Sequence, residues 1–179
     1  MAIMKLGHVG IYAQDIDALK RFYTDVVGLQ IADESAELGA VFMSSNPDRE
    51  HHEFVLFRAK DAHGSNVQQI SFSCESPEDI VNYYHRFKEH GVRFDRVVSH
   101  GNAIGLYFYD PEGNRCEVYW TTPFKAKQPY GVAVDLTKPL DEVIAEIEAD
   151  VSQYAATGHR DPESFVHQRE QLEREGIRV

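Results

Sequence analysis

The feature that most constrains the fold is an internal repeat, which begins with a strand, a helix and three short strands. Alternating apolar residues in KLGHVGIYA predict a strand, and apolar residues at helical spacing follow it until a closing Gly28. β-rich segments separated by turn residues come next, at 29–33, 39–45 and 51–59. The first half of the chain is therefore predicted to have the order β, α, β, β, β.

The same order begins again after the polar segment 60–66. QQISFSC predicts a strand, and the helix that follows has a Ser76 cap before Pro77. When His8 is superposed on Gln69, apolar helix positions of the two halves coincide at equal offsets. The last three strands are expected at VRFDRVV, AIGLYFYD and RCEVYWT. We therefore predict an α+β fold in which two paired βαβββ modules, approximately 4–60 and 66–122, form an open barrel-like antiparallel β-sheet in one domain, 1–122.

The remaining residues, 123–179, are predicted to be a linker and a helical C-terminal extension. Pro and Gly punctuate its first part, and two amphipathic helices follow. The first of these helices carries one apolar stripe, made of Leu140, Val143, Ile144, Ile147 and Val151. Such a stripe packs on the parent domain or on a second subunit more often than it binds a cofactor, so we expect a homo-oligomer, a dimer or larger.

Charge and composition exclude several classes of function. The chain of 179 residues has 18 Lys and Arg against 29 Asp and Glu, a formal net charge of -11, which repels nucleic acid. Cys74 and Cys116 are expected in strands as reduced thiols. No signal-peptide pattern or membrane-spanning run is seen, so a cytoplasmic protein without membrane partners is expected.

Several polar residues lie where strand alternation turns them into the expected cavity. His8 and Gln69 occupy the same position in the two modules, and Glu117 lies among apolar strand neighbours. Together they would form a three-ligand site with open positions, suited to iron(II), manganese(II), nickel(II) or zinc(II). Such a site would chelate a catecholate or an enediolate.

Further candidates lie near the ends of strands. His51, His52 and Glu53 are adjacent, and alternation allows only one of the two histidines to face the cavity. His100 and Tyr107 are expected to take a proton and to stabilise developing charge, near a loop marked by Gly101 and Gly105.

The repeated modules, with GHVGIYAQDIDALKRFYTDVVGL at the start and YFYDPEGNRCEVYW at the close, resemble the vicinal oxygen chelate superfamily. Within it the chain is most similar to type I extradiol ring-cleaving dioxygenases, which carry a His-His pair at the same place. The resemblance implies a non-heme iron(II) enzyme that cleaves a catechol-like aromatic with O2. It also implies metal ligands at His8 and Glu117, an acid-base histidine at His52, and substrate-contacting residues at His100 and Tyr107.

The sequence departs from the extradiol pattern at Gln69, where those enzymes have a third ligand, a histidine. Glutamine is a ligand in glyoxalase I, and aligning the module ends sets Glu53 opposite Glu117. A quartet of His8, Glu53, Gln69 and Glu117 would then resemble a glyoxalase-like lyase or isomerase. A metal-free protein that only binds a small molecule, as in drug resistance, is the third alternative.

Overall fold

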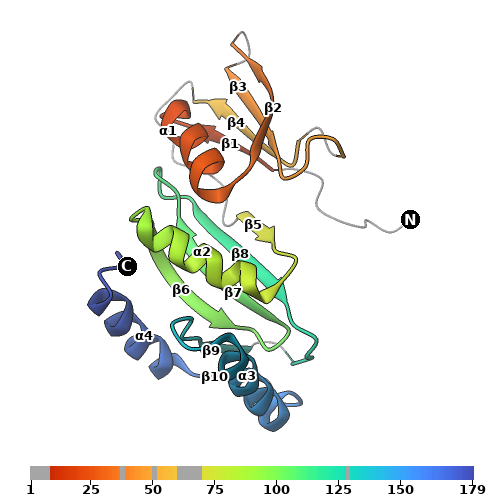
Figure 1. Ribbon diagram of the computed structural model, residues 1–179, viewed down its shortest axis with the longest axis vertical. Helices are drawn as coiled ribbons and strands as arrows, with labels where there is room; N and C mark the ends of the chain where they lie inside the picture. Colours follow the sequence, from red (N-terminus) through yellow and green to blue (C-terminus); the bar gives the residue numbers. More distant parts are fainter. Residues whose placement is uncertain (1–8, 37–38, 50–51, 60–69, 128–129) are drawn as a thin grey trace. The chain divides into compact units, whose positions relative to one another are not determined.

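The protein is a mixed α+β chain, as predicted, and its described strands form two β-sheets (Figure 1). The computed structural model describes residues 9–36, 39–49, 52–59, 70–127 and 130–179. These residues form two compact units. The first unit contains the residues up to Ile70 together with Asp110–Asn114, and the second contains Ser71–Tyr109 and Arg115–Val179. The domain boundary at residue 122 stays a prediction.

The first unit has the predicted strand and helix order. Asp15 caps the helix by accepting a hydrogen bond from the Ala18 amide, and Gly28, at φ 93°, ends it in the left-handed conformation that glycine tolerates. The last turns of this helix widen into a π-helix, η1. The elements are β1 (Val9–Ala13), α1 (Ile16–Arg21), η1 (Phe22–Val27), β2 (Gln30–Ser35), β3 (Ala40–Ser44) and β4 (Phe54–Arg58).

The second unit repeats this order and then continues into the C-terminal extension. Ser76, directly before Pro77, forms a capping box with Asp79, which confirms the predicted start of the helix. The repeated elements are β5 (Ile70–Ser73), α2 (Pro77–Glu89), β6 (Arg93–Ser99), β7 (Ala103–Tyr109) and β8 (Arg115–Thr121). The extension adds β9 (Tyr130–Ala133), α3 (Leu140–Tyr154), β10 (His159–Arg160) and α4 (Pro162–Arg174).

The topology confirms the internal repeat. The first sheet has the order β1-β4-β3-β2, and the second contains β5-β8-β7-β6, the same order with each strand number raised by four. Both modules also have an irregularity at the equivalent place, between Ile31 and Asp33 in β2 and between Phe94 and Arg96 in β6. One expectation was wrong: the sheets are not purely antiparallel, because β1 runs parallel to β4. The helix between β1 and β2 carries the chain back across the sheet and permits this parallel pairing.

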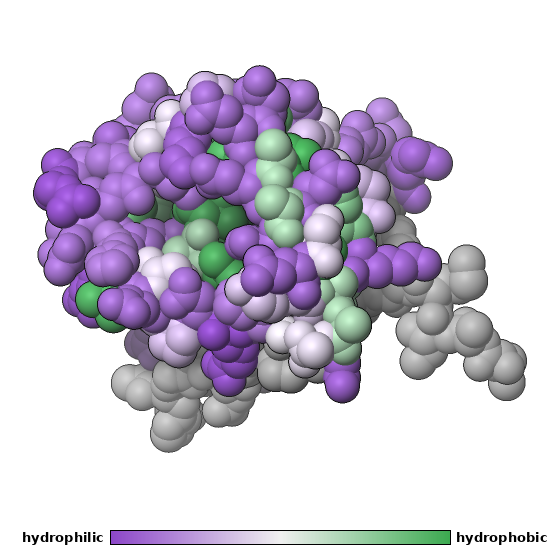
Figure 2. All heavy atoms as spheres, turned by 90° about the horizontal axis from the view of Figure 1, so that it is seen from below, coloured by the Kyte–Doolittle hydropathy of each residue, from purple (hydrophilic) through white to green (hydrophobic). Residues whose placement is uncertain are grey.

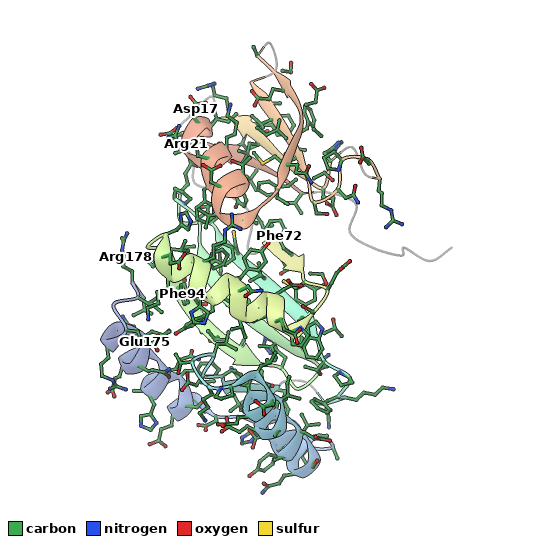
Figure 3. The ribbon with its side chains drawn as sticks, in the orientation of Figure 1. Asp17, Arg21, Phe72, Phe94, Glu175 and Arg178 are labelled. Carbon is green, nitrogen blue, oxygen red and sulfur yellow. The ribbon has the colours of Figure 1, made fainter. Side chains whose placement is uncertain are left out.

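Helix α2 covers one face of the second sheet (Figures 1 and 3). The ring of Phe87 on α2 lies 4.4 Å from that of Phe108 on β7, centroid to centroid, and Phe94, labelled in Figure 3, packs edge-on against Tyr84. These side chains are fully buried. The apolar core of the second unit therefore lies between α2 and the sheet, and α2 leaves the opposite face of the sheet uncovered.

The C-terminal extension continues the second sheet beyond β6. Strand β9 pairs with β6 through Val98 and Ser99, and the buried Gln168 of α4 bonds to backbone groups of β6. The carbonyl of Arg178, beyond α4, accepts a hydrogen bond from the Phe94 amide of β6 (Figure 3). The predicted packing of this segment on the rest of the chain is thus observed, and Val143, Ile147 and Val151 of the predicted stripe are buried.

The surface is hydrophilic, and of the two cysteines expected in strands only Cys116 lies in one. Seen from below, the protein is mostly hydrophilic, with apolar side chains gathered in a hollow (Figure 2). Cys74 directly follows β5, Cys116 lies within β8, and both are free thiols. Among the described residues, every helix is too short or too polar to cross a membrane.

Candidate functional site

The candidate site lies on the face of the second sheet opposite α2. Tyr107 on β7 is directly opposite Glu117 on β8, so both side chains leave the same face of the sheet. The next pair, Phe108 and Cys116, points the other way, toward Phe87 of α2. Strand alternation therefore sends Tyr107 and Glu117 away from the apolar core, as predicted.

Glu117 is buried on this face, with 6% of its surface exposed. The Ser71 hydroxyl of β5 donates a hydrogen bond of 2.7 Å to its Oε2 atom, and the Tyr107 hydroxyl also donates to the carboxylate. Gly105 lies beneath it, where any side chain would overlap Oε1. Gly105 was expected to mark a nearby loop as well as to lie in the strand AIGLYFYD; it lies within β7, and it leaves room for the carboxylate.

His100 continues this hydrogen-bonded chain. Its Nε2 atom lies 3.1 Å from the Tyr107 hydroxyl and its Nδ1 atom 2.9 Å from the carbonyl oxygen of Tyr130. The carbonyl can only accept, and the single hydrogen of Tyr107 is donated to Glu117. The Nδ1 atom of His100 is therefore the donor to the Tyr130 carbonyl. The two predicted residues, His100 and Tyr107, are thus joined by hydrogen bonds in a chain that ends on Glu117.

The environment of Tyr107 favours its neutral phenol. Burial, followed by the hydrogen bond to Glu117 and the charge of that carboxylate, raises the pKa of Tyr107 well above its ordinary value. The guanidinium carbon of Arg115 lies 4.1 Å from the centroid of the Tyr107 ring and acts in the opposite direction. Tyr107 thus remains a hydrogen-bond donor throughout the neutral pH range.

A cavity of about 430 Å³ opens beside this chain of residues. Its volume is in the range of pockets that hold small organic ligands. It is lined by Ser71, His100, Asn102, Ala103, Tyr107, Glu117 and Tyr119. A buried carboxylate, a phenol and an imidazole therefore converge on a space that a single aromatic ring can enter.

A β-bulge adds a residue that the sequence pattern did not reveal. Phe94 pairs with Phe108 on the helix-facing side, whereas Arg96 pairs with Tyr107 on the open side. Two residues separated by one position would share a face in a regular strand, but the extra residue Asp95 reverses the alternation. Arg96 therefore joins the site face.

In the first unit, His52 lies on the corresponding face. Phe42 is directly opposite Val55, while the adjacent Phe54 packs under the Tyr23 ring of the helix, 4.3 Å between centroids. The His52 ring meets Phe42 edge-on at 5.2 Å, so it lies on the face turned away from the helix. This is the face on which the sequence predicts an acid-base histidine.

Glu53 is held by the loop that follows β3. Its Oε2 atom accepts hydrogen bonds from the Ser45 amide at 2.7 Å, from the Ser45 hydroxyl at 2.5 Å, and from Ser44. The bulges common to the two modules align Phe42 with Tyr107, and hence Val55, the partner of Phe42, with Glu117. The predicted alignment of Glu53 with Glu117 is therefore wrong by two residues, because counting from the module ends ignores their unequal turns.

Two of the three predicted metal ligands, His8 and Gln69, lie outside the described residues, as does His51. Within the described ranges, no three histidine, cysteine or acidic side chains gather as a metal cluster would require. Ser71, Arg96 and the Tyr130 carbonyl were not predicted as site residues. Only Ser71 had a sequence signal, since it lies two positions after Gln69 on the same predicted strand.

Comparison with known proteins identifies the superfamily to which the chain belongs. The profile described as the Glyoxalase/Bleomycin resistance protein/Dioxygenase superfamily matches residues 5–118, and the chain belongs to this superfamily. The manganese-dependent 2,3-dihydroxybiphenyl 1,2-dioxygenase of Geobacillus genomosp. 3 is 26% identical over 72% of this chain and 40% of that enzyme. Biphenyl-2,3-diol 1,2-dioxygenase 3 of Rhodococcus globerulus is 24% identical over 64% of this chain and 62% of its own.

The chain thus aligns with less than two thirds of the length of either dioxygenase. Among solved structures, lactoylglutathione lyase from Agrobacterium tumefaciens superposes with a TM-score of 0.54 and 22% identity, covering 67% of this chain and 96% of the lyase. That similarity supports the fold alone. The superfamily, and with it the predicted fold resemblance, is therefore confirmed, while the names of its members cover several chemistries.

Proposed function

We propose that this protein is a metal-dependent extradiol-type dioxygenase that acts on a catechol-like aromatic. The observation that carries the proposal is the chain of hydrogen bonds from His100 through Tyr107 to the buried Glu117, beside a cavity of about 430 Å³. Two distant relatives, with 24% and 26% identity, are dioxygenases, and this similarity favours the same function.

The surroundings of Glu117 suit a divalent metal. Glu117 offers a carboxylate on the cavity wall, and Gly105 leaves the space around its Oε1 atom clear of side chains. The resemblance implies His8 and Gln69 as the remaining N and O ligands of this site. A metal bound there, iron(II) or manganese(II), would supply open positions for the two adjacent hydroxyls of a catechol and for O2.

The residues around the carboxylate would handle protons and charge. Tyr107, kept neutral by burial, would turn its hydroxyl hydrogen from Glu117 to a catechol oxygen that becomes charged. His100 passes a proton to Tyr107 or receives one from it over 3.1 Å. For His52, which lies on the open face of the first sheet, the acid-base role implied by the resemblance stays a prediction.

The glyoxalase-like alternative is less well supported, because it needs Glu53 as a fourth ligand. The Oε2 atom of Glu53 is engaged by Ser44 and Ser45, and the residue aligned with Glu117 is Val55, which cannot bind a metal. A three-ligand site that lacks this carboxylate agrees with the extradiol arrangement.

The test is to load the purified protein anaerobically with iron(II) or manganese(II), add a panel of catechols, and then admit oxygen. A yellow ring-cleavage product with one O2 consumed per ring is expected, and Glu117→Gln should abolish it. Stoichiometric metal without colour or oxygen uptake on any catechol would overturn the proposal. A chain that retains no metal but still binds aromatics would instead be the small-molecule-binding type.

A further inference from the structure

A second cavity adjoins the first and is distinguished by its charge. It measures about 560 Å³, and both cavities are lined by His100 and Tyr107. Three arginines also line it, one from each of three strands: Arg96 of β6, Arg115 of β8 and Arg160 of β10. Such a concentration of positive charge stands out in a chain with a net charge of -11.

Two of the arginines are held in place by aromatic rings and by one shared carboxylate. Arg96 and Arg115 both pair with Asp95, at 3.2 and 2.9 Å. The guanidinium of Arg115 stacks on Tyr107 at 4.1 Å and that of Arg96 on Phe165 at 5.4 Å. The bulge that contains Asp95 thus turns Arg96 into the cavity and neutralises only part of the positive charge it brings.

The third arginine and an acidic neighbour come from the extension. Arg160 is exposed, and within the described ranges it forms no ion pair. Asp161 also lines the cavity, but its Oδ1 atom is already bound to the Glu163 and Ser164 amides at the start of α4. With Asp95 and Asp161 counted against three guanidinium groups, an excess of one positive charge remains, which suits a single anionic group.

The extension therefore contributes one wall of this cavity, through Tyr130, Arg160 and Phe165. These residues lie beyond residue 118, where the superfamily match ends. The extension was predicted to serve packing or dimerisation; its position beside the site face gives it a direct part in what the site can bind.

We infer that the arginine-lined cavity binds the carboxylate of an aromatic substrate whose ring enters the neighbouring cavity beside Glu117. The substrate class is then a catechol with a short acidic side chain, and the extension selects it. Arginine forks bind carboxylates in a bidentate manner, and the aromatic walls suit the intervening carbons. This inference deepens the proposed function and rests on it for the catechol ring, but not for the anion.

The test measures binding alone, so its outcome does not depend on a metal or on turnover. Phenylpropionate and its neutral isostere phenylpropionamide are titrated calorimetrically into the full-length chain at low salt. The acid is expected to bind at least about tenfold more tightly than the amide, with the advantage reduced by added salt. Equal affinities for the two compounds would overturn the inference.

Variants of the cavity arginines test which residues cause the preference for the acid. Arg160→Gln, at an exposed position, should remove most of the preference for the acid, and Arg96→Gln should do the same. Arg174→Gln, exposed near the end of α4 and outside the cavity, is the matched control and should keep the preference. An unchanged preference in both cavity variants would also overturn the inference. Ring cleavage of neutral and acidic catechols at equal rates would leave the dioxygenase proposal intact while contradicting the anion pocket.

Discussion

Gly105 lies directly beneath the carboxylate of Glu117, on the neighbouring strand, and a methyl group at Gly105 would overlap Oε1 and come within 3.0 Å of Tyr107 Cε2. Neither neighbour can move freely, because Glu117 is buried and hydrogen-bonded to Ser71 and Tyr107. The position of the carboxylate therefore depends on the absence of a side chain at residue 105.

Gly105→Ala should displace Glu117 and weaken metal binding by about 10- to 100-fold, the usual effect of disturbing the support of a ligand. Overpacking should also lower the free energy of unfolding by about 1–3 kcal/mol. Metal titration and urea unfolding measure the two effects. Gly10→Ala, in β1, is the control for stability, since its nearest neighbour would be the Phe57 ring edge at 3.3 Å. An alanine variant with normal metal affinity would show that Glu117 is not a ligand.

Tyr107→Phe should keep the fold and the metal but lower kcat by about 100-fold or more, because His100 and Glu117 lose the hydroxyl that connects them. Steady-state kinetics and metal analysis of the same preparation separate these effects. The control is Tyr109→Phe, two residues along the same strand, whose ring stacks against Arg93 at 3.9 Å. Equal loss of activity in both variants would refute a specific role for the Tyr107 hydroxyl.

Gln168→Leu should destabilise the protein by about 2–4 kcal/mol, because it leaves several backbone groups buried without partners. The Gln168 amide donates to the carbonyls of Val97 and Val134 and accepts from the Val97 amide, at 2.7 to 3.1 Å, with 5% of the residue exposed. Urea unfolding measures the change. Glu170→Gln, exposed on the same helix, should alter stability by less than about 0.5 kcal/mol. A Gln168 variant as stable as the control would show that water replaces these bonds.

The repeat could be predicted because it depends on local patterns, and His100 and Tyr107 could be named as site residues, with the roles that the resemblance implies. Helical spacing before Gly28, the Ser76 cap, and the alternation around Glu117 each act within a few residues of the chain. Strand alternation also placed Glu117 on the cavity face. Its neighbours before and after it in the sequence are apolar and point to the opposite face of the sheet.

What could not be predicted depends on contacts between distant segments. The bulge at Asp95 changes which face Arg96 occupies, and nothing in VRFDRVV marks it. The role of Gly105 is visible only when β8 brings Glu117 over it, and the arginine cavity requires Arg160 to approach Arg96 of β6, which is more than sixty positions away in the sequence. Counting from module ends failed for Glu53 for the same reason: turn lengths differ between the two modules.

Cys74 should be a slowly reacting thiol at neutral pH. Burial, followed by the negative charge of Asp79, raises the pKa of Cys74 to about 12. A raised folded-state pKa means that the protonated thiol is favoured, so the stability it contributes is complete below the ordinary value near 9 and declines as pH rises above it. The thiolate that reacts with alkylating agents is accordingly scarce at pH near 8.

The measurement is alkylation by iodoacetamide, followed by mass spectrometry, in a Cys116→Ala variant in which Cys74 is the single thiol. In the folded protein the rate should keep rising with pH above 9, whereas in urea it should level off near the ordinary thiol value. At pH near 8 the alkylation rate in the folded protein should be at least about 100-fold lower than the rate in urea. Asp79→Asn should speed the reaction relative to Glu78→Gln, because only Asp79 acts on the thiol. A folded rate that levels off near pH 9 would show that solvent reaches Cys74 freely.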